Sequence, residues 1–150
     1  MNEPTPFVHR NLPRLLLEAR EAVMQHTRPS LREHGLSDQQ WRVLRVLGEH
    51  AAERAGVETG RVAREALLLG PSLTGVLTRM ERDGLIERRA HPRDKRAQQI
   101  FLTDKARDMR EEALAAAEEA EQAVFQGFRR FEKELLKEYI RWAIANARKL

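Results

Sequence analysis

The sequence predicts a mostly helical protein that contains one small two-stranded β-hairpin. Over most of the chain, apolar residues recur at the i, i+3, i+4, i+7 spacing of helices with one buried face. Only "LIERRA" (85–90) and "AQQIFL" (97–102) have the composition of strands. Between them lies "HPRDKR", whose Pro, Asp and basic residues suit an exposed turn. We therefore expect a single hairpin within an α-helical chain.

The first two helices are predicted from capping residues and apolar stripes. Asn11 can cap a first helix, while Pro29 is expected to kink or end it and Gly35 to close the segment. Its stripe consists of Leu12, Leu15, Leu16, Ala19 and Val23. Ser37 and Gln40 form a capping box that opens the second helix. The inward face of that helix consists of Gln40, Trp41, Leu44 and Leu47.

Two further short helices are separated by a tight turn at 69–70. Thr59 is expected to start the first of them, Pro71 suits the first position of the second, and Gly84 ends it. The inward residues are Val62, Ala63, Ala66 and Leu67, then Leu73, Val76, Leu77 and Met80. Two short helices joined by a tight turn that contains Gly are the helix-turn-helix pattern.

The hairpin is followed by two longer helices. In its second strand Ile100 and Leu102 lie on one side, and Thr103 caps the helix that follows. The inward positions of that helix are Ala106, Met109, Ala113, Ala116, Ala117, Ala120 and Val124. Gly127 and the charged segment 132–134 are expected to mark a break. The final helix carries Leu135, Leu136, Tyr139, Ile140, Ala143 and Ile144.

This order of elements has the form of a winged helix-turn-helix core between terminal helices. We expect one domain over 1–150, with a winged-helix part at about 37–103 and dimerisation helices at about 8–34 and 104–150. The apolar stripes of the terminal helices are too many for so small a core. A homodimer is therefore expected.

Composition limits the classes of function. The 150 residues include no Cys, which excludes disulfides and cysteine zinc sites. There is neither an apolar run of 18 residues nor a signal-peptide pattern, so a cytoplasmic protein is expected. The net charge of +4 is small, but its distribution is uneven. Seven basic and four acidic residues lie between 79 and 96, whereas 108–121 carries six acids and one Arg.

The basic segment has the features of a surface that binds double-stranded DNA. With its apolar side inward, the fourth helix presents Ser72, Thr74, Gly75, Thr78, Arg79 and Arg82 to solvent. Short side chains allow close approach to a major groove. The hairpin adds Arg89, Arg93, Lys95 and Arg96, and an Arg at its tip fits a narrow minor groove. Asp94 is expected to hold the Arg96 guanidinium by a charge-assisted hydrogen bond. An ordinary solvated turn with an incidental ion pair is the alternative.

Three segments resemble the MarR family of winged-helix transcription regulators: "GLSDQQWRVLRVL", "PSLTGVLTRMERDGLIERR" and "DKRAQQIFLT". The last matches the wing signature of that family at Asp94, Arg96, Ile100, Leu102 and Thr103. With "LLLEAREAVM" and "RPSL", the chain is similar to the branch that regulates homoprotocatechuate (4-hydroxyphenylacetate) degradation operons. The resemblance implies a symmetric dimer that represses from a pseudo-palindromic operator and is released by an aromatic acid.

The resemblance also implies an effector pocket between the dimerisation helices and the winged helix. An aromatic carboxylate needs a cation, an apolar wall and a polar group for the phenol. The candidate residues are Arg20, Met24, His26, Trp41 and Arg45. Each also has a simpler interpretation as a core, interface or surface ion-pair residue.

Other classes of function have less support. The five His are scattered at 9, 26, 34, 50 and 91, without metal-site spacing, and no phosphate-binding loop or nucleophile elbow is present. We therefore expect no enzyme, no cofactor and no metal. A helical protein-interaction module would explain the terminal helices but not the basic hairpin. A regulator that responds to a different ligand, or to none, remains open.

Overall fold

The computed structural model describes residues 11–51 and 55–150, and it is mostly helical as predicted. Residues 8–10 of the expected first dimerisation segment lie outside the described residues. The elements are α1 (Leu12–Glu33), α2 (Asp38–Glu49), β1 (Val57–Glu58), α3 (Thr59–Ala66), α4 (Gly70–Arg82), β2 (Ile86–Ala90), β3 (Gln98–Leu102), α5 (Asp104–Val124) and α6 (Arg130–Ala147).

The sheet has one strand more than predicted. Its order is β1-β3-β2, with both pairs antiparallel. The hairpin register runs from Ile86 opposite Leu102 to Ala90 opposite Gln98, and Val57 of β1 lies opposite Ile100. The predicted hairpin is confirmed as β2 and β3, whereas β1 was missed because it has two residues, too few to show an alternating pattern. As the central strand, β3 is buried at Gln99 as well as at Ile100 and Leu102.

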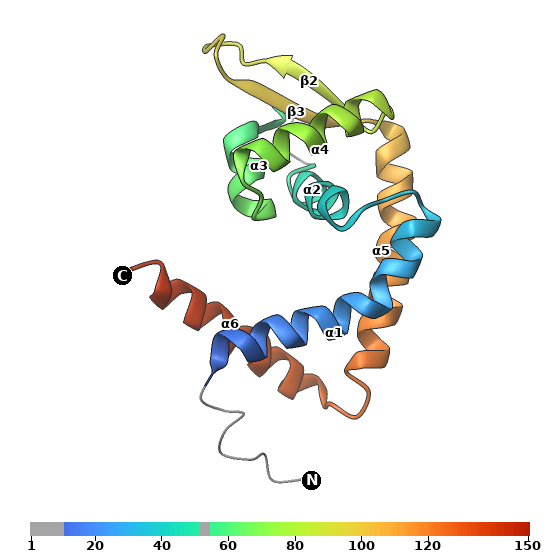
Figure 1. The fold of residues 1–150 in the computed structure, drawn as a ribbon, viewed down its shortest axis with the longest axis vertical. Helices are drawn as coiled ribbons and strands as arrows, with labels where there is room; N and C mark the ends of the chain where they lie inside the picture. The colour runs from blue at the N-terminus through green and yellow to red at the C-terminus, as the bar shows by residue number, and fades with distance from the viewer. Residues whose placement is uncertain (1–10, 52–54) are drawn as a thin grey trace.

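The core lies where α2 meets the helix-turn-helix, the sheet and the start of α5. Its most enclosed side chains include Val43, Leu44, Val62, Val76, Leu77, Met80, Ile86, Ile100 and Ala106. Figure 1 shows α2 enclosed by α3, α4, β3 and α5. The predicted inward face of α4 is confirmed, since all four of its apolar residues are buried.

Most predicted helix ends are confirmed. The side chain of Asn11 accepts a hydrogen bond from the Arg14 N–H, and Ser37 and Gln40 form the capping box. Thr103 caps α5. Gly35 and Gly84 follow helices with φ of +70° and +73°, a conformation that glycine adopts without strain.

Two of the expected helix ends lie inside helices. The first is at Pro29, which was expected to kink or end its helix: α1 does not end there but continues to Glu33. Proline removes one backbone donor, whereas Thr27 and Leu31 on either side of it are buried and hold the last turns against the protein. The second concerns 132–134, which lie inside α6 because the break comes earlier, between Val124 and Arg130. Gly127 lies in this link with φ +91°.

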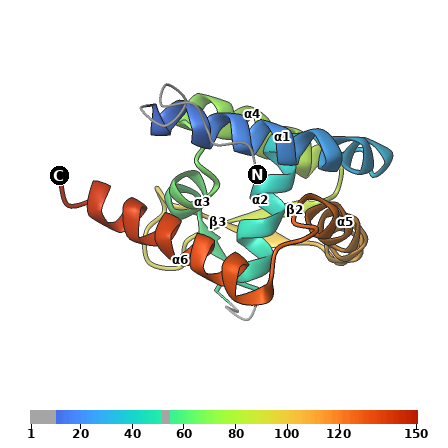
Figure 2. The ribbon, with the colours of Figure 1, turned by 90° about the horizontal axis from the view of Figure 1, so that it is seen from below.

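The terminal helices extend away from the winged-helix part. In Figure 1, α5 runs from the sheet to the opposite end of the molecule, where α6 turns back. The helices α1 and α6 cross in that view, but Figure 2 shows them apart. No residue of α6 is buried. Among the described residues, no helix is both long and apolar enough to cross a membrane.

Candidate nucleic-acid interface and effector residues

The outer face of α4 consists of small and basic side chains. Ser72, Thr74, Thr78, Arg79 and Arg82 are exposed, and Gly75 is half-buried. The Thr74 hydroxyl donates to the Gly70 carbonyl at 3.0 Å, and the Thr78 hydroxyl donates to the Thr74 carbonyl at 2.9 Å. These bonds hold the two side chains close to the helix backbone, so this face of α4 can approach the floor of a major groove closely.

The two arginines of α4 differ in their partners. Arg82 Nε lies 3.0 Å from Asp83 Oδ1, and this hydrogen bond raises the pKa of Arg82. Within 11–51 and 55–150, Arg79 has no carboxylate partner, and its guanidinium lies beside Gly75. Arg79 is therefore the more available of the two cations for a nucleic acid.

An ion pair joins α4 to the hairpin. Arg88 Nε on β2 lies 2.8 Å from Glu81 Oε2, and Arg88 Nη2 lies 3.4 Å from Glu81 Oε1. The hydrogen bond to Arg88 lowers the pKa of Glu81. Because the pair is seven residues apart across a turn, no helical spacing rule could have identified it from the sequence. It fixes the orientation of the hairpin relative to α4.

The cations of the hairpin lie at two levels. Arg93, Lys95 and Arg96 are exposed at the tip. On β2, the Arg89 guanidinium lies 4.3 Å from the centroid of the Phe101 ring and 2.7 Å from Glu87 Oε2. Arg89 is thus held against the sheet, whereas the three tip side chains extend beyond it.

Asp94 has a different partner from the one expected. Its Oδ1 accepts a hydrogen bond from the backbone N–H of Arg96 at 2.9 Å, and among the described residues its carboxylate makes no ion pair with the Arg96 guanidinium. A short acidic side chain reaches the backbone two residues ahead more easily than the end of a long Arg. Asp94 therefore shapes the turn and leaves the guanidinium free.

Among the candidate effector residues, Arg20 links two helices. Its Nη2 lies 2.9 Å from Asp38 Oδ2 at the start of α2, and its Nη1 lies 2.9 Å from Glu21 Oε1. The hydrogen bond to Asp38 raises the pKa of Arg20. A ligand carboxylate that binds Arg20 must therefore compete with two protein carboxylates.

The other candidates lie in unlike surroundings. Trp41 is buried, and the guanidinium of the exposed Arg45 lies 5.7 Å from the centroid of its ring. Met24 is half-buried against the core. His26 is exposed on α1. The structure thus brings Trp41 and Arg45 together, whereas His26 has no part in that pair.

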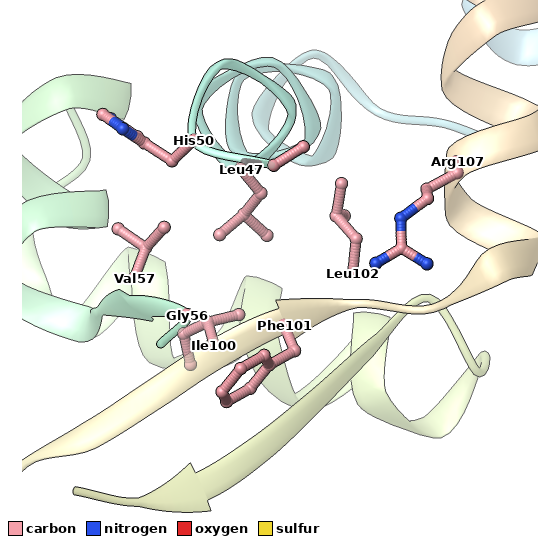
Figure 3. Close-up of a pocket in the computed structure, with 9 residues that line it drawn as sticks. Leu47, His50, Gly56, Val57, Ile100, Phe101, Leu102 and Arg107 are labelled. Atoms are coloured by element: carbon pink, nitrogen blue, oxygen red, sulfur yellow. The ribbon is translucent and has the colours of Figure 1, made fainter. Parts of the chain in front are cut away.

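A small cavity lies between the C-terminal end of α2 and the strand β3 (Figure 3). It is lined by Leu47, His50, Ala51, Gly56, Val57, Ile100, Phe101, Leu102 and Arg107. Its volume of about 30 Å³ corresponds to about one water molecule. This cavity is too small for an aromatic acid.

The helix-turn-helix itself is held by groups that the sequence reasoning missed. Arg42 Nη1 donates to the carbonyls of Ala66 at 3.1 Å and Leu67 at 3.2 Å, at the end of α3. Leu67 has φ +54°, in the left-handed region. His50 Nε2 lies 2.6 Å from Glu65 Oε2 and lowers the pKa of that carboxyl. A long Arg that caps a distant helix leaves no local sequence signal.

The architecture is that of a winged helix-turn-helix regulator, and the comparisons agree. Residues 34–97 match the model of the MarR family. The homoprotocatechuate degradative operon repressor of Escherichia coli is 42% identical over 113 residues, which cover 75% of this chain and 74% of that protein. The regulator FarR of Neisseria gonorrhoeae is 35% identical over 137 residues, 91% of both chains.

Solved structures show the same relationship. The crystal structure of NadR in complex with 4-hydroxyphenylacetate is similar with a TM-score of 0.78 and 34% identity, over 94% of this chain and 97% of that one. The chain belongs to the MarR family, and it is a transcriptional regulator of that type.

Proposed function

We propose that this regulator is a homodimeric repressor of an operon for aromatic-acid degradation, released from its operator by a small phenolic acid. The observation that supports DNA binding best is that two candidate DNA-binding surfaces, on α4 and at the tip of the hairpin, are joined by an ion pair. The Arg88–Glu81 pair connects α4, with its outer face of small side chains, to the wing, which is the hairpin of β2 and β3. The three exposed cations at the tip of the wing are thereby fixed relative to that face. Such a unit suits a major groove and the minor groove beside it.

The proposed DNA contacts are made by Ser72, Thr74, Gly75, Thr78, Arg79, Arg82, Arg89, Arg93, Lys95 and Arg96. In a dimer, two copies of α4 would read half-sites about 34–36 Å apart, one turn of DNA. Support for the regulated pathway comes from the 42% identical operon repressor, and support for the ligand class from the NadR complex. The proposed effector residues remain Arg20, Met24, His26, Trp41 and Arg45.

DNA binding is tested by fluorescence anisotropy with the DNA upstream of the protein's own gene, over a series of salt concentrations. Arg79→Ala and Arg96→Ala should each weaken binding and reduce the salt slope by about one. Lys137→Ala is the control, because it also removes one positive charge, but from α6, which is remote from the wing in Figure 1. Unchanged DNA affinity in both test variants, with the fold intact, would contradict the proposed DNA interface and favour a protein-interaction module.

Effector release is tested on the same complex by titration with 4-hydroxyphenylacetate and homoprotocatechuate, with benzoate and salicylate for comparison. Release by the arylacetates alone supports the proposed pathway. Coupling of about 1–3 kcal/mol, or 5–150-fold, is enough for a switch. Arg20→Ala should retain DNA binding and lose release. Tight binding that no acid disturbs would leave a regulator with another ligand or none.

A further inference from the structure

The tip of the wing is built around a histidine side chain. The hairpin ladder ends at Ala90 opposite Gln98, and the His91 N–H donates to the Ala97 carbonyl at 3.0 Å. Beyond this bond the backbone turns, and the Ala97 N–H donates to the Asp94 carbonyl at 3.1 Å. The imidazole of His91 is half-buried beneath this turn, although the residues from Pro92 to Arg96 are exposed.

The contacts of His91 determine its tautomer. Its Nδ1 lies 3.1 Å from the backbone nitrogen of Arg93 and 3.3 Å from that of Asp94. A backbone N–H can only donate, so Nδ1 must be an unprotonated acceptor. In a neutral imidazole the proton is then on Nε2, which lies 3.7 Å from Glu58 Oε1 on β1.

The local sequence explains why this acceptor is needed. Pro92 has no N–H, so the first donors after His91 are those of Arg93 and Asp94. Both point to the same imidazole nitrogen. The carboxylate of Asp94 accepts the N–H of Arg96, two residues further on. The two side chains together organise the backbone that carries Arg93, Lys95 and Arg96.

We propose that His91 is the positioning residue of the wing: its Nδ1 acceptor orders the tip, and its Nε2 side directs the tip toward Glu58 on β1. The tip cations are thereby presented to DNA in one arrangement, which lowers the entropy lost when they bind. His91 itself makes no contact with DNA. This inference rests on the proposed function of the wing in DNA binding.

Two substitutions separate the acceptor from the rest of the side chain. In His91→Asn, the amide oxygen is as many bonds from Cα as Nδ1, and Asn before Pro favours such a turn. In His91→Gln, the amide is one bond farther out, so the acceptor near Cα is lost. We expect His91→Asn to bind the operator within about twofold of the wild type, and His91→Gln to bind about five- to tenfold more weakly.

These affinities decide the proposal directly. Equal weakening by His91→Asn and His91→Gln would overturn it, because the acceptor would then not matter, and so would wild-type affinity in both variants. Glu58→Gln retains a polar acceptor but removes the charge that faces Nε2. It should weaken binding less than His91→Gln, and a larger loss would show that the contact with β1, and not the acceptor, positions the tip.

A measurement on the free protein separates this inference from the proposed function. Nitrogen-15 NMR of the full chain at pH 8 should show His91 protonated at Nε2 alone, and a proton on Nδ1 would overturn the assignment. Hydrogen exchange of the Arg93 and Asp94 amides should be faster in His91→Gln than in His91→Asn. Equal rates would contradict the hydrogen bonds from these two amides to His91 Nδ1. Wild-type DNA affinity in Arg93→Ala and Arg96→Ala would instead contradict the wing's proposed contact with DNA.

Discussion

At the scale of single residues, Leu67 is in a backbone conformation that its side chain disfavours. It is the only residue other than Gly within 11–51 and 55–150 that has a positive φ. A left-handed conformation costs an L-residue about 1–2 kcal/mol, whereas glycine adds about 0.5–1 kcal/mol of unfolded-state entropy. Since Leu67 is 75% exposed, we expect Leu67→Gly to raise the free energy of unfolding by about 0.5–1 kcal/mol.

Leu69 provides the control for this prediction. It is 81% exposed and has φ −68°, so glycine relieves no strain there. Leu69 is the N-cap residue of α4, where Gly is preferred over Leu, and this preference offsets the entropy cost of Gly, so Leu69→Gly should leave the free energy of unfolding within about 0.5 kcal/mol of the wild type. Urea denaturation of both variants at one protein concentration measures the difference. Equal destabilisation in the two would show that the turn at Leu67 carries no strain.

The Arg88–Glu81 pair predicts a pH dependence of stability. The hydrogen bond to Arg88 lowers the pKa of Glu81 below its ordinary value of 4.5. The contribution to stability is therefore fully present above the pKa of the unfolded state and is lost as pH falls through the lower folded pKa. Glu81→Gln should reduce stability at neutral pH, and the difference from the wild type should shrink in acid. A difference that is constant down to low pH would contradict the ion pair.

At the scale of elements, Thr103 joins the end of the wing to α5. Its Oγ1 accepts the Ala106 N–H at 3.2 Å and donates to the Gly84 carbonyl at 2.7 Å, just after α4. Thr103→Val keeps the shape and removes both bonds, so we expect a loss of about 1–2 kcal/mol in urea denaturation. Thr103→Ser keeps the hydroxyl and should stay within about 0.5 kcal/mol. A similar loss in both variants would contradict this role.

The elements also show how far sequence reasoning reaches. Caps and stripes are local signals, so Ser37, Thr103 and the buried face of α4 were predicted correctly. The strand β1 was missed because its pairing with β3 is long-range and only two residues long. The candidate DNA-binding surface was predicted from the exposed positions of α4 and of the hairpin turn. The partners that fix it, such as Glu81 for Arg88, depend on tertiary contacts that no spacing encodes.

At the scale of the whole molecule, many of the exposed large apolar side chains lie on the terminal helices. The exposed side chains include Leu12, Leu16 and Leu17 of α1, Phe131, Leu135, Leu136, Tyr139, Ile140, Trp142 and Ile144 of α6, and Phe128 before it. Clusters of exposed apolar side chains are typical of protein interfaces. In the proposed homodimer, a second copy of the chain would cover these side chains. DNA affinity would then depend on α6, although α6 is remote from the wing in Figure 1.

The proposed dimer is tested by changing the two sides of α6 separately. Ile140 lies on the apolar side, whereas Arg141, one residue on, points about 100° away toward the polar side. Ile140→Glu should yield a monomer in sedimentation at micromolar concentration and lose most of its operator affinity, because a single copy of α4 reads one half-site. Arg141→Glu brings in the same side chain and should remain dimeric. A wild-type chain that sediments as a monomer, or an Ile140→Glu dimer with full DNA affinity, would show that this face serves another partner.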